Sequence, residues 1–246
     1  DLLIAYPSAQ KSDADILADL SARRKTVSIV CDDEAQLDVL ERAAAARSTT
    51  IRVCVELDVS YRPGAGFLHL GGRRSPLHDA NAVVAFADAV RRRAHLQVDG
   101  VMAYEGHIAG VTDKNPFAPA MNAPKRALKL LSKGDVAKRR AATWSALKGA
   151  GHDVRVMNGG GTGSLAWASS EDALTEVTAG SGYVDSHLFS YYRDLDLVPA
   201  AFFALQAVRK PKAGMVTCHG GGYVASGEAG PDRLPVPALP AGASLL

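Results

Sequence analysis

The chain has 246 residues, of which 47% are hydrophobic and 22% charged, so it can bury a sizeable core in one large domain, or in one domain and a fragment. Its formal charge of only +2, with lysine and arginine dispersed, argues against binding to nucleic acid. No basic-then-apolar stretch opens the sequence, no apolar run reaches about 18 residues, and three cysteines stand far apart. We expect a cytoplasmic protein with no membrane partner.

Strand-like apolar runs alternate with helix-like segments along most of the sequence. The predicted strands fall within residues 1–7, 26–31, 51–59, 98–107, 152–161 and 174–184. Helices are predicted between them, most clearly at residues 79–94 and from about 124 to 147. Repeated β-then-α units with nearly continuous apolar strands predict a parallel sheet that is covered by helices.

The positions of the polar residues decide between an open doubly wound sheet and a (β/α)8 barrel. Glu56, Tyr104 and Asn158 each come at the end of a different strand, whereas in a doubly wound sheet such residues gather at one switch point. We therefore predict an α/β fold, a (β/α)8 TIM-type barrel with six strands visible and two missing before Asp1.

The chain is predicted to have two domains. Residues 1–194 would form the barrel, incomplete at its N-terminus, and residues 195–246 would form part of a β-rich second domain with a Pro-rich tail. Within residues 195–246, the segments 197–211 and 214–227 have the pattern of strands separated by turns.

A glycine-rich loop, residues 159–164 (GGGTGS), follows the predicted strand at 152–161. Glycine lets a ligand approach the backbone closely, so the loop can direct N–H groups at an anion, and the hydroxyls of Thr162 and Ser164 add donors. A second turn of small residues, 179–184, follows the next strand, and two such loops after neighbouring strands are the usual phosphate site of a barrel. The alternative is that these glycines only form tight turns.

Tyr104, Glu105 and His107 come at the end of a predicted strand, VDGVM at residues 98–102. Side chains alternate along a strand, so all three cannot face inward if that strand stays regular. Tyr104 is the candidate for contact with a ligand ring. His107 is the candidate for a supporting hydrogen bond, with a purely structural role as its alternative.

Several arginines precede or accompany these motifs. Arg62, Arg73 and Arg74 lie in one loop, where an arginine can hold an anionic substrate or a cofactor ring, although solvation is the default for any one of them. The basic runs at residues 91–93 and 138–140 are predicted to be solvated helix faces.

The motifs VELDV…RRSPLH, YEGH, NGGGTGS, GSGYV and CHGGGYVASGEAGPDRLPVP occur in this order along almost the whole chain. Together they resemble the D-threonine aldolase and amino acid deaminase branch of the alanine racemase-like, fold-type III enzymes that use pyridoxal 5'-phosphate (PLP). That family's fold is a (β/α)8 barrel followed by a β-domain. The resemblance implies a homodimeric PLP-dependent lyase of small D-β-hydroxy amino acids, acting by retro-aldol cleavage of D-threonine-like substrates or by dehydration and deamination.

The resemblance also assigns site residues. Tyr104 would lie against the pyridine ring, with His107 behind it, and Arg74, or alternatively Arg73, would contact the ring nitrogen or the phenolate side. The residues that would bind the PLP phosphate are Gly161, Thr162, Gly163, Ser181, Gly182 and Tyr183.

Two features of the family are missing from this sequence. Its Schiff-base lysine ends the first barrel strand, upstream of Asp1, and the lysines found here are expected in helical or loop contexts. A divalent metal is a further family cofactor, but its ligands would fall beyond Leu246, and Cys218 with His219 fits a turn better than a metal site. We expect a truncated portion that is inactive alone.

Three other functions remain open from the sequence. An amino acid racemase of the same fold would need a second base, for which no candidate is clear. A non-catalytic PLP-binding homeostasis protein is disfavoured by the tail after residue 194. The last is a metal-dependent or phosphosugar barrel enzyme that uses the glycine loops for a substrate phosphate.

Overall fold

The computed structural model describes residues 1–64, 66–221 and 230–245. It divides into two compact units. The barrel unit comprises Asp1–Gly110 and Leu128–Thr178, and the second unit comprises Val111–Ala127 and Ala179–Leu246. The predicted domain boundary after residue 194 stays a prediction.

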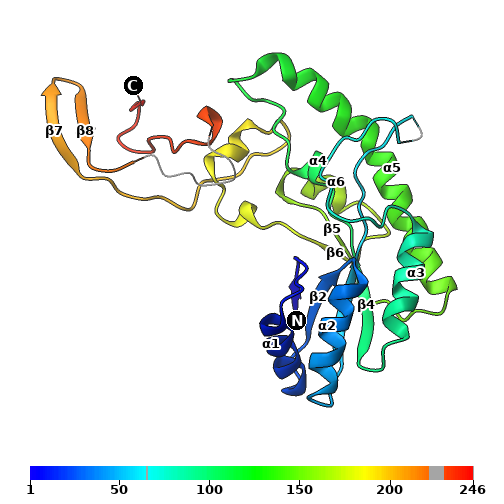
Figure 1. The fold of residues 1–246 in the computed structure, drawn as a ribbon. Coiled ribbons are helices and arrows are strands. Elements are labelled where there is room, and N and C mark those ends of the chain that lie inside the picture. The colour runs from blue at the N-terminus through cyan, green and yellow to red at the C-terminus, as the bar shows by residue number, and fades with distance from the viewer. Residues whose placement is uncertain (65, 222–229, 246) are drawn as a thin grey trace. The chain divides into compact units, whose positions relative to one another are not determined.

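A six-stranded parallel sheet forms the centre of the barrel unit (Figure 1). Every strand pairs with the next strand along the chain. In a doubly wound sheet the strand order reverses at a switch point, and this sheet has no such reversal among its six strands. The predicted α/β barrel architecture is therefore confirmed, as a partial barrel of six strands. The strands are β1 (Leu2–Ile4), β2 (Val27–Cys31), β3 (Ile51–Glu56), β4 (Leu96–Met102), β5 (Val156–Gly159) and β6 (Glu176–Val177).

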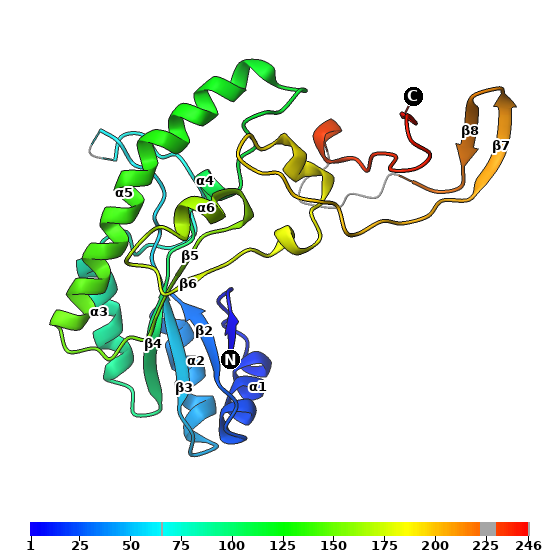
Figure 2. The ribbon, with the colours of Figure 1, turned by 180° about the vertical axis from the view of Figure 1, so that it is seen from behind.

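Helices alternate with these strands, and Figure 2 shows them from behind. Asp33 caps α2, because its carboxylate accepts the amide N–H of Ala35, and the Gln36 side chain completes a capping box that contributes about 1 kcal/mol. Both helices that the sequence marked most clearly, α3 and α5, are present. The α-helices are α1 (Lys11–Ala22), α2 (Glu34–Ala45), α3 (Ala80–Arg91), α4 (Gly106–Ala109), α5 (Asn122–Gly149) and α6 (Leu165–Ala168).

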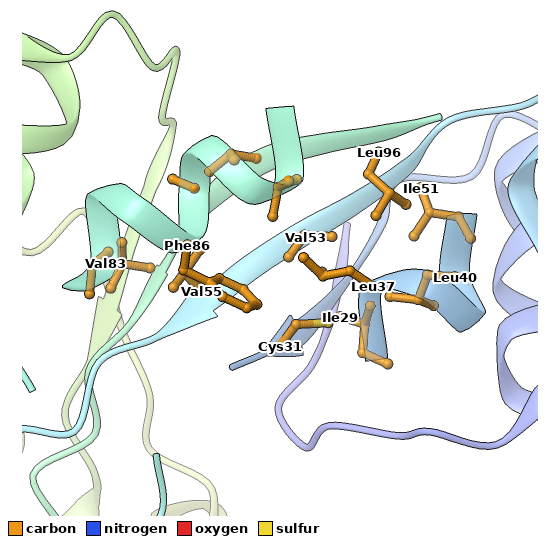
Figure 3. Packing of buried hydrophobic residues seen from close by; sticks show 14 of the residues in the cluster. Ile29, Cys31, Leu37, Leu40, Ile51, Val53, Val55, Val83, Phe86 and Leu96 are labelled. Atoms are coloured by element: carbon orange, nitrogen blue, oxygen red, sulfur yellow. The ribbon is translucent and has the colours of Figure 1, made fainter. Parts of the chain in front are cut away.

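The main hydrophobic core lies between one face of the sheet and the helices (Figure 3). Ile29 of β2 and Val53 of β3 pack there beside Leu37 of α2 and Phe86 of α3. Burying one such side chain contributes about 1.5–3 kcal/mol.

The other face of the sheet carries a separate, small cluster. Val30, Cys54 and Met102 form it, with Leu3 packed alongside. Because side chains alternate along a strand, these residues point away from the helices that cover their sequence neighbours. A helix layer on one face and a distinct cluster on the other is the arrangement of a barrel wall, and it agrees with the strand order.

Asp99 organises the polar residues on this inner face, near the amino ends of the strands. Its buried carboxylate accepts hydrogen bonds from Ser28 Oγ at 2.5 Å, Arg52 Nη1 at 3.0 Å and Arg155 Nη2 at 2.6 Å. Burial by itself raises the pKa of Asp99, but these hydrogen bonds outweigh it and hold the pKa below its usual value. Polar contacts at this end of a barrel serve stability rather than catalysis.

The second unit contains an antiparallel hairpin of β7 (Ala207–Lys212) and β8 (Met215–Cys218). The prediction of a strand beginning at residue 197 was wrong, because residues 197–206 have no regular structure. Lys210 and Lys212 lie in β7, so placing them in helical or loop contexts was also wrong. Residues 222–227 of the other predicted strand lie outside the described residues.

No helix in the described part of the chain combines the length and the apolar character that a bilayer crossing requires.

Candidate functional site

Three loops at the carboxyl ends of β3, β4 and β5 carry most of the predicted site residues. These strands are neighbours and run parallel, so their ends lie at one edge of the sheet. The strand β4 ends at Met102, and the backbone turns into the short helix α4 at Gly106. Tyr104, Glu105 and His107 therefore come after the strand, as the sequence indicated, and the alternation that a regular strand would impose on them does not apply.

Tyr104 stands at the centre of this edge. Its half-buried ring lies against two glycines: a Cβ added at Gly161 would come 3.0 Å from Tyr104 Cε2, and one added at Gly106 would come 3.1 Å from Cε1. The Arg74 guanidinium carbon lies 5.5 Å from the ring centroid, within the range of a cation–π contact. Burial raises the pKa of the Tyr104 phenol, so the hydroxyl stays protonated at neutral pH.

Glu56 fixes the position of Arg74. The Arg74 Nε donates to Glu56 Oε1 at 2.7 Å, and the carboxyl group is buried at the end of β3. Burial raises the pKa of Glu56, although Arg74 opposes that effect. The structure thus brings together Tyr104, Arg74 and Gly161, three of the residues that the sequence singled out.

Protein atoms already occupy the space that side chains would take at the first glycines of the loop. A Cβ at Gly159 would lie 2.6 Å from Arg140 Nη2, and one at Gly160 would lie 2.5 Å from Val177 Cγ1. Gly160 also has φ +81°, a conformation that L side chains rarely adopt. These two glycines are thus required by packing within the protein, whether or not the loop binds an anion.

The hydrogen bonds of the loop are largely internal. Gly160 N–H donates to Glu105 Oε2 at 3.0 Å, and Gly161 N–H donates to Ser164 Oγ at 3.1 Å. The Ser164 hydroxyl in turn donates to Glu105 Oε1 at 2.5 Å, so its use as a ligand donor was a wrong expectation. The loop then forms a 3-10 turn, Thr162–Ser164, directly before α6.

Glu105 and Arg140 form a completely buried ion pair beneath this loop. Arg140 also donates to Ala103 O and, at 2.5 Å, to Glu171 Oε1. Burial raises the pKa of Glu171, against the lowering effect of Arg140. One guanidinium and one carboxylate therefore connect the loops after β4, β5 and α6.

The prediction that residues 138–140 form a solvated face was wrong. Arg140 is 0% exposed, and Arg139 donates from Nη2 to the backbone oxygens of Val59 and Ser60, both at 2.7 Å. In the other basic run Arg91 and Arg92 are exposed as predicted, whereas Arg93 forms ion pairs with Glu34 and Asp38 and is mostly buried.

His107 is buried in α4, close to the loop that follows β3. A Cβ at Gly71 would come 3.3 Å from His107 Nδ1. The ring's Nε2 has no hydrogen-bond partner among the described residues, and burial lowers the pKa of the imidazole. His107 is therefore neutral at physiological pH, and its supporting hydrogen bond stays a prediction.

The remaining predicted phosphate residues belong to the second unit. Ser181–Tyr183 forms a 3-10 turn in which the Tyr183 side chain is largely exposed. The pairing of this turn with the glycine loop stays a prediction. Cys218 is an exposed, free thiol at the end of β8, and no group of three or more His, Cys, Asp or Glu side chains suited to a metal occurs among the described residues.

The sheet and the helices that cover it define the fold class as a partial (β/α) barrel. Neither a family model nor a curated protein sequence matches the chain. The solved structure of D-threonine aldolase from Filomicrobium marinum is similar, with a TM-score of 0.71 and 22% identity over 89% of this chain and 53% of that one.

Two further solved structures share the fold. One is D-threo-3-hydroxyaspartate dehydratase from Delftia sp. HT23, with a TM-score of 0.52 and 19% identity over 74% of this chain and 42% of that one. The other is an alanine racemase-like protein from Idiomarina loihiensis, with a TM-score of 0.52 and 17% identity over 78% and 44% of the two chains. The chain spans about half the length of these proteins.

Proposed function

We propose that the chain is part of a PLP-dependent lyase that acts on small D-β-hydroxy amino acids, by aldol cleavage between Cα and Cβ or by loss of the β-hydroxyl. The observation that carries the proposal is the grouping of Tyr104, Arg74 and Gly161 at the carboxyl ends of consecutive parallel strands, where barrel enzymes have their active sites. The similarity in fold to a D-threonine aldolase and to a hydroxyaspartate dehydratase supports the choice of reaction.

The residues present fit PLP. A pyridine ring can pack against the Tyr104 ring, which lies beside two glycines. A phenolate oxygen can accept from the guanidinium of Arg74, which Glu56 holds in place. A phosphate can bind to the 3-10 turn of small residues in the glycine loop. The unpartnered Nε2 of His107 supplies a further polar group that is buried close by. When bound, PLP supplies the electron sink that stabilises negative charge at the substrate Cα.

Each residue has a defined task under this proposal. Tyr104 packs against the ring and limits its tilt. Arg74 donates to the phenolate side, and Glu56 keeps its guanidinium in place. Gly161, Thr162 and Gly163 of the glycine loop would hold the phosphate, and the assignment of Ser181, Gly182 and Tyr183 to it rests on the sequence resemblance alone. The neutral imidazole of His107 supports Tyr104 from behind.

The covalent lysine, any metal ligands and the homodimer contacts belong to the same proposal. The lysine and the metal ligands have no counterpart assigned in this sequence, and the chain covers 53% of the D-threonine aldolase structure.

Equilibrium dialysis with PLP tests the function directly. We expect the full-length protein to bind PLP and Gly161→Ala to weaken binding at least tenfold, since the added Cβ would come 2.8 Å from Ala109 Cβ and 3.0 Å from Tyr104 Cε2. Gly134→Ala is the matched control, because it adds the same methyl group in open space on α5. Failure of the wild-type protein to bind PLP would refute the proposal.

A further inference from the structure

A ligand-sized space lies beside Arg74, within the barrel unit. It is a cavity of about 450 Å³ formed by the loop that follows β3. We call it the arginine cavity. Its charged and titratable lining residues are Asp58, Arg62, His69, Arg73, Arg74 and His78. Because Arg74 also lies over the Tyr104 ring, the cavity adjoins the site described above.

The arginine cavity has an excess of positive charge. Arg62 is paired with Asp58, whose Oδ2 lies 3.1 Å from its Nη2, and Arg74 is paired with Glu56 at 2.7 Å. Arg73, in contrast, has no ion-pair or hydrogen-bond partner among the residues that the structure describes. Two of the three guanidinium groups are thus neutralised by the protein, and one is left over.

A histidine supplies a hydrogen-bonding group in the same place. The buried Nδ1 of His78 has no hydrogen-bond partner among the described residues, and at 3.6 Å Asp58 Oδ2 is too far away to accept from it. Burial, with help from Arg62, lowers the pKa of this imidazole. A buried polar atom without a partner is costly, which favours a ligand that supplies one.

We propose that the arginine cavity binds a second carboxylate of the substrate, so that the preferred substrates are D-amino acids with an acidic side chain. A single unpaired guanidinium matches a monoanionic carboxylate better than a phosphate dianion, and its planar fork can bind both carboxylate oxygens. This inference rests on the proposed function, because it places the α-carbon of the substrate beside Tyr104 and Arg74. It narrows the substrates of that function from small D-β-hydroxy amino acids in general to those with a second carboxylate.

Isothermal titration calorimetry of the PLP-loaded, full-length protein tests this with D-aspartate and D-asparagine. The two ligands have the same shape and differ in the charge of the side chain. We expect D-aspartate to bind at least tenfold more tightly, and Arg73→Gln to remove that preference while it leaves D-asparagine binding within about twofold. Arg92→Gln is the matched control, because it removes an exposed arginine at the end of α3 and should keep the preference.

Equal affinities of the wild-type protein for the two ligands would overturn the inference, as would a preference that survives Arg73→Gln. An equal loss of the preference for D-aspartate in Arg92→Gln would also overturn it, because it would indicate only long-range attraction between the positive charge of the protein and the ligand. The PLP dialysis separates these failures from a failure of the proposed function. If the protein binds PLP but does not distinguish the two amino acids, the proposed function stands and only the proposed role of the arginine cavity is refuted.

Discussion

Replacing Glu105 with Gln tests the buried ion pair that connects the loops of the site. The substitution keeps the size of the side chain and an oxygen for Gly160 N–H, but it removes the charge opposite Arg140. Both partners are 0% exposed, and removing one member of a buried pair costs about 3–5 kcal/mol. Glu171 stays beside Arg140 at 2.5 Å, so we expect the lower end, about 3 kcal/mol.

Urea unfolding followed by tryptophan fluorescence measures this loss. Both tryptophans lie in the barrel unit, and the Arg140 guanidinium carbon is 5.7 Å from the centroid of the Trp167 ring. Glu34→Gln is the control, because it makes the same chemical change at a largely exposed carboxylate that pairs with Arg93, and it should cost no more than about 1 kcal/mol. Equal small losses in Glu105→Gln and Glu34→Gln would refute the reasoning.

Two further predictions concern the free energy of unfolding. Gly160→Ala should lower it by about 2–3 kcal/mol, because the alanine would need φ +81° and its Cβ would meet a valine methyl group of β6 at 2.5 Å. Gly134→Ala in open space should instead raise it by up to about 1 kcal/mol, and equal urea midpoints for the two variants would contradict this reading. The folded pKa of Asp99 is depressed, so its ionised form stabilises the protein above the unfolded pKa of about 4, and this contribution is lost as pH falls through the folded value. Unfolding titrations across this range should show the wild-type protein losing its advantage over Asp99→Asn at acid pH; an advantage independent of pH would argue against the ionised network.

The order of the strands and helices could be predicted because it depends on local patterns. Apolar runs of strand length mark β1 to β5, and the helical period of residues 79–94 marks α3. The predicted loop residues also lie at strand ends, as the positions of Glu56 and Tyr104 show. The directions of the Tyr104 and His107 side chains could not be predicted, because both residues come after the end of β4 at Met102, where strand alternation does not apply.

The burial of Arg140 could not be read from the basic run at residues 138–140, yet the sequence does contain a signal for it. Arg140 stands four residues after Val136 and seven before Leu147, in the buried stripe of α5. A charged residue in an apolar stripe needs a buried partner. Its partner Glu105 lies 35 positions away in the loop after β4, and only the packing of α5 against the sheet brings the two together.

The glycine loop shows why missing side chains alone do not establish a phosphate site. A side chain at Gly159 would collide with Arg140, and one at Gly160 would collide with Val177. Packing therefore requires glycine at both positions even in a protein that binds no cofactor. Gly161 is also crowded, since an added Cβ would come 2.8 Å from Ala109 Cβ, but its other neighbour is Tyr104, the residue on which the proposed ring contact depends. The dialysis of Gly161→Ala must therefore be compared with its stability: weaker PLP binding with an unchanged urea midpoint would locate the cofactor at this residue. A loss of stability as large as that of Gly160→Ala would assign Gly161 to packing as well.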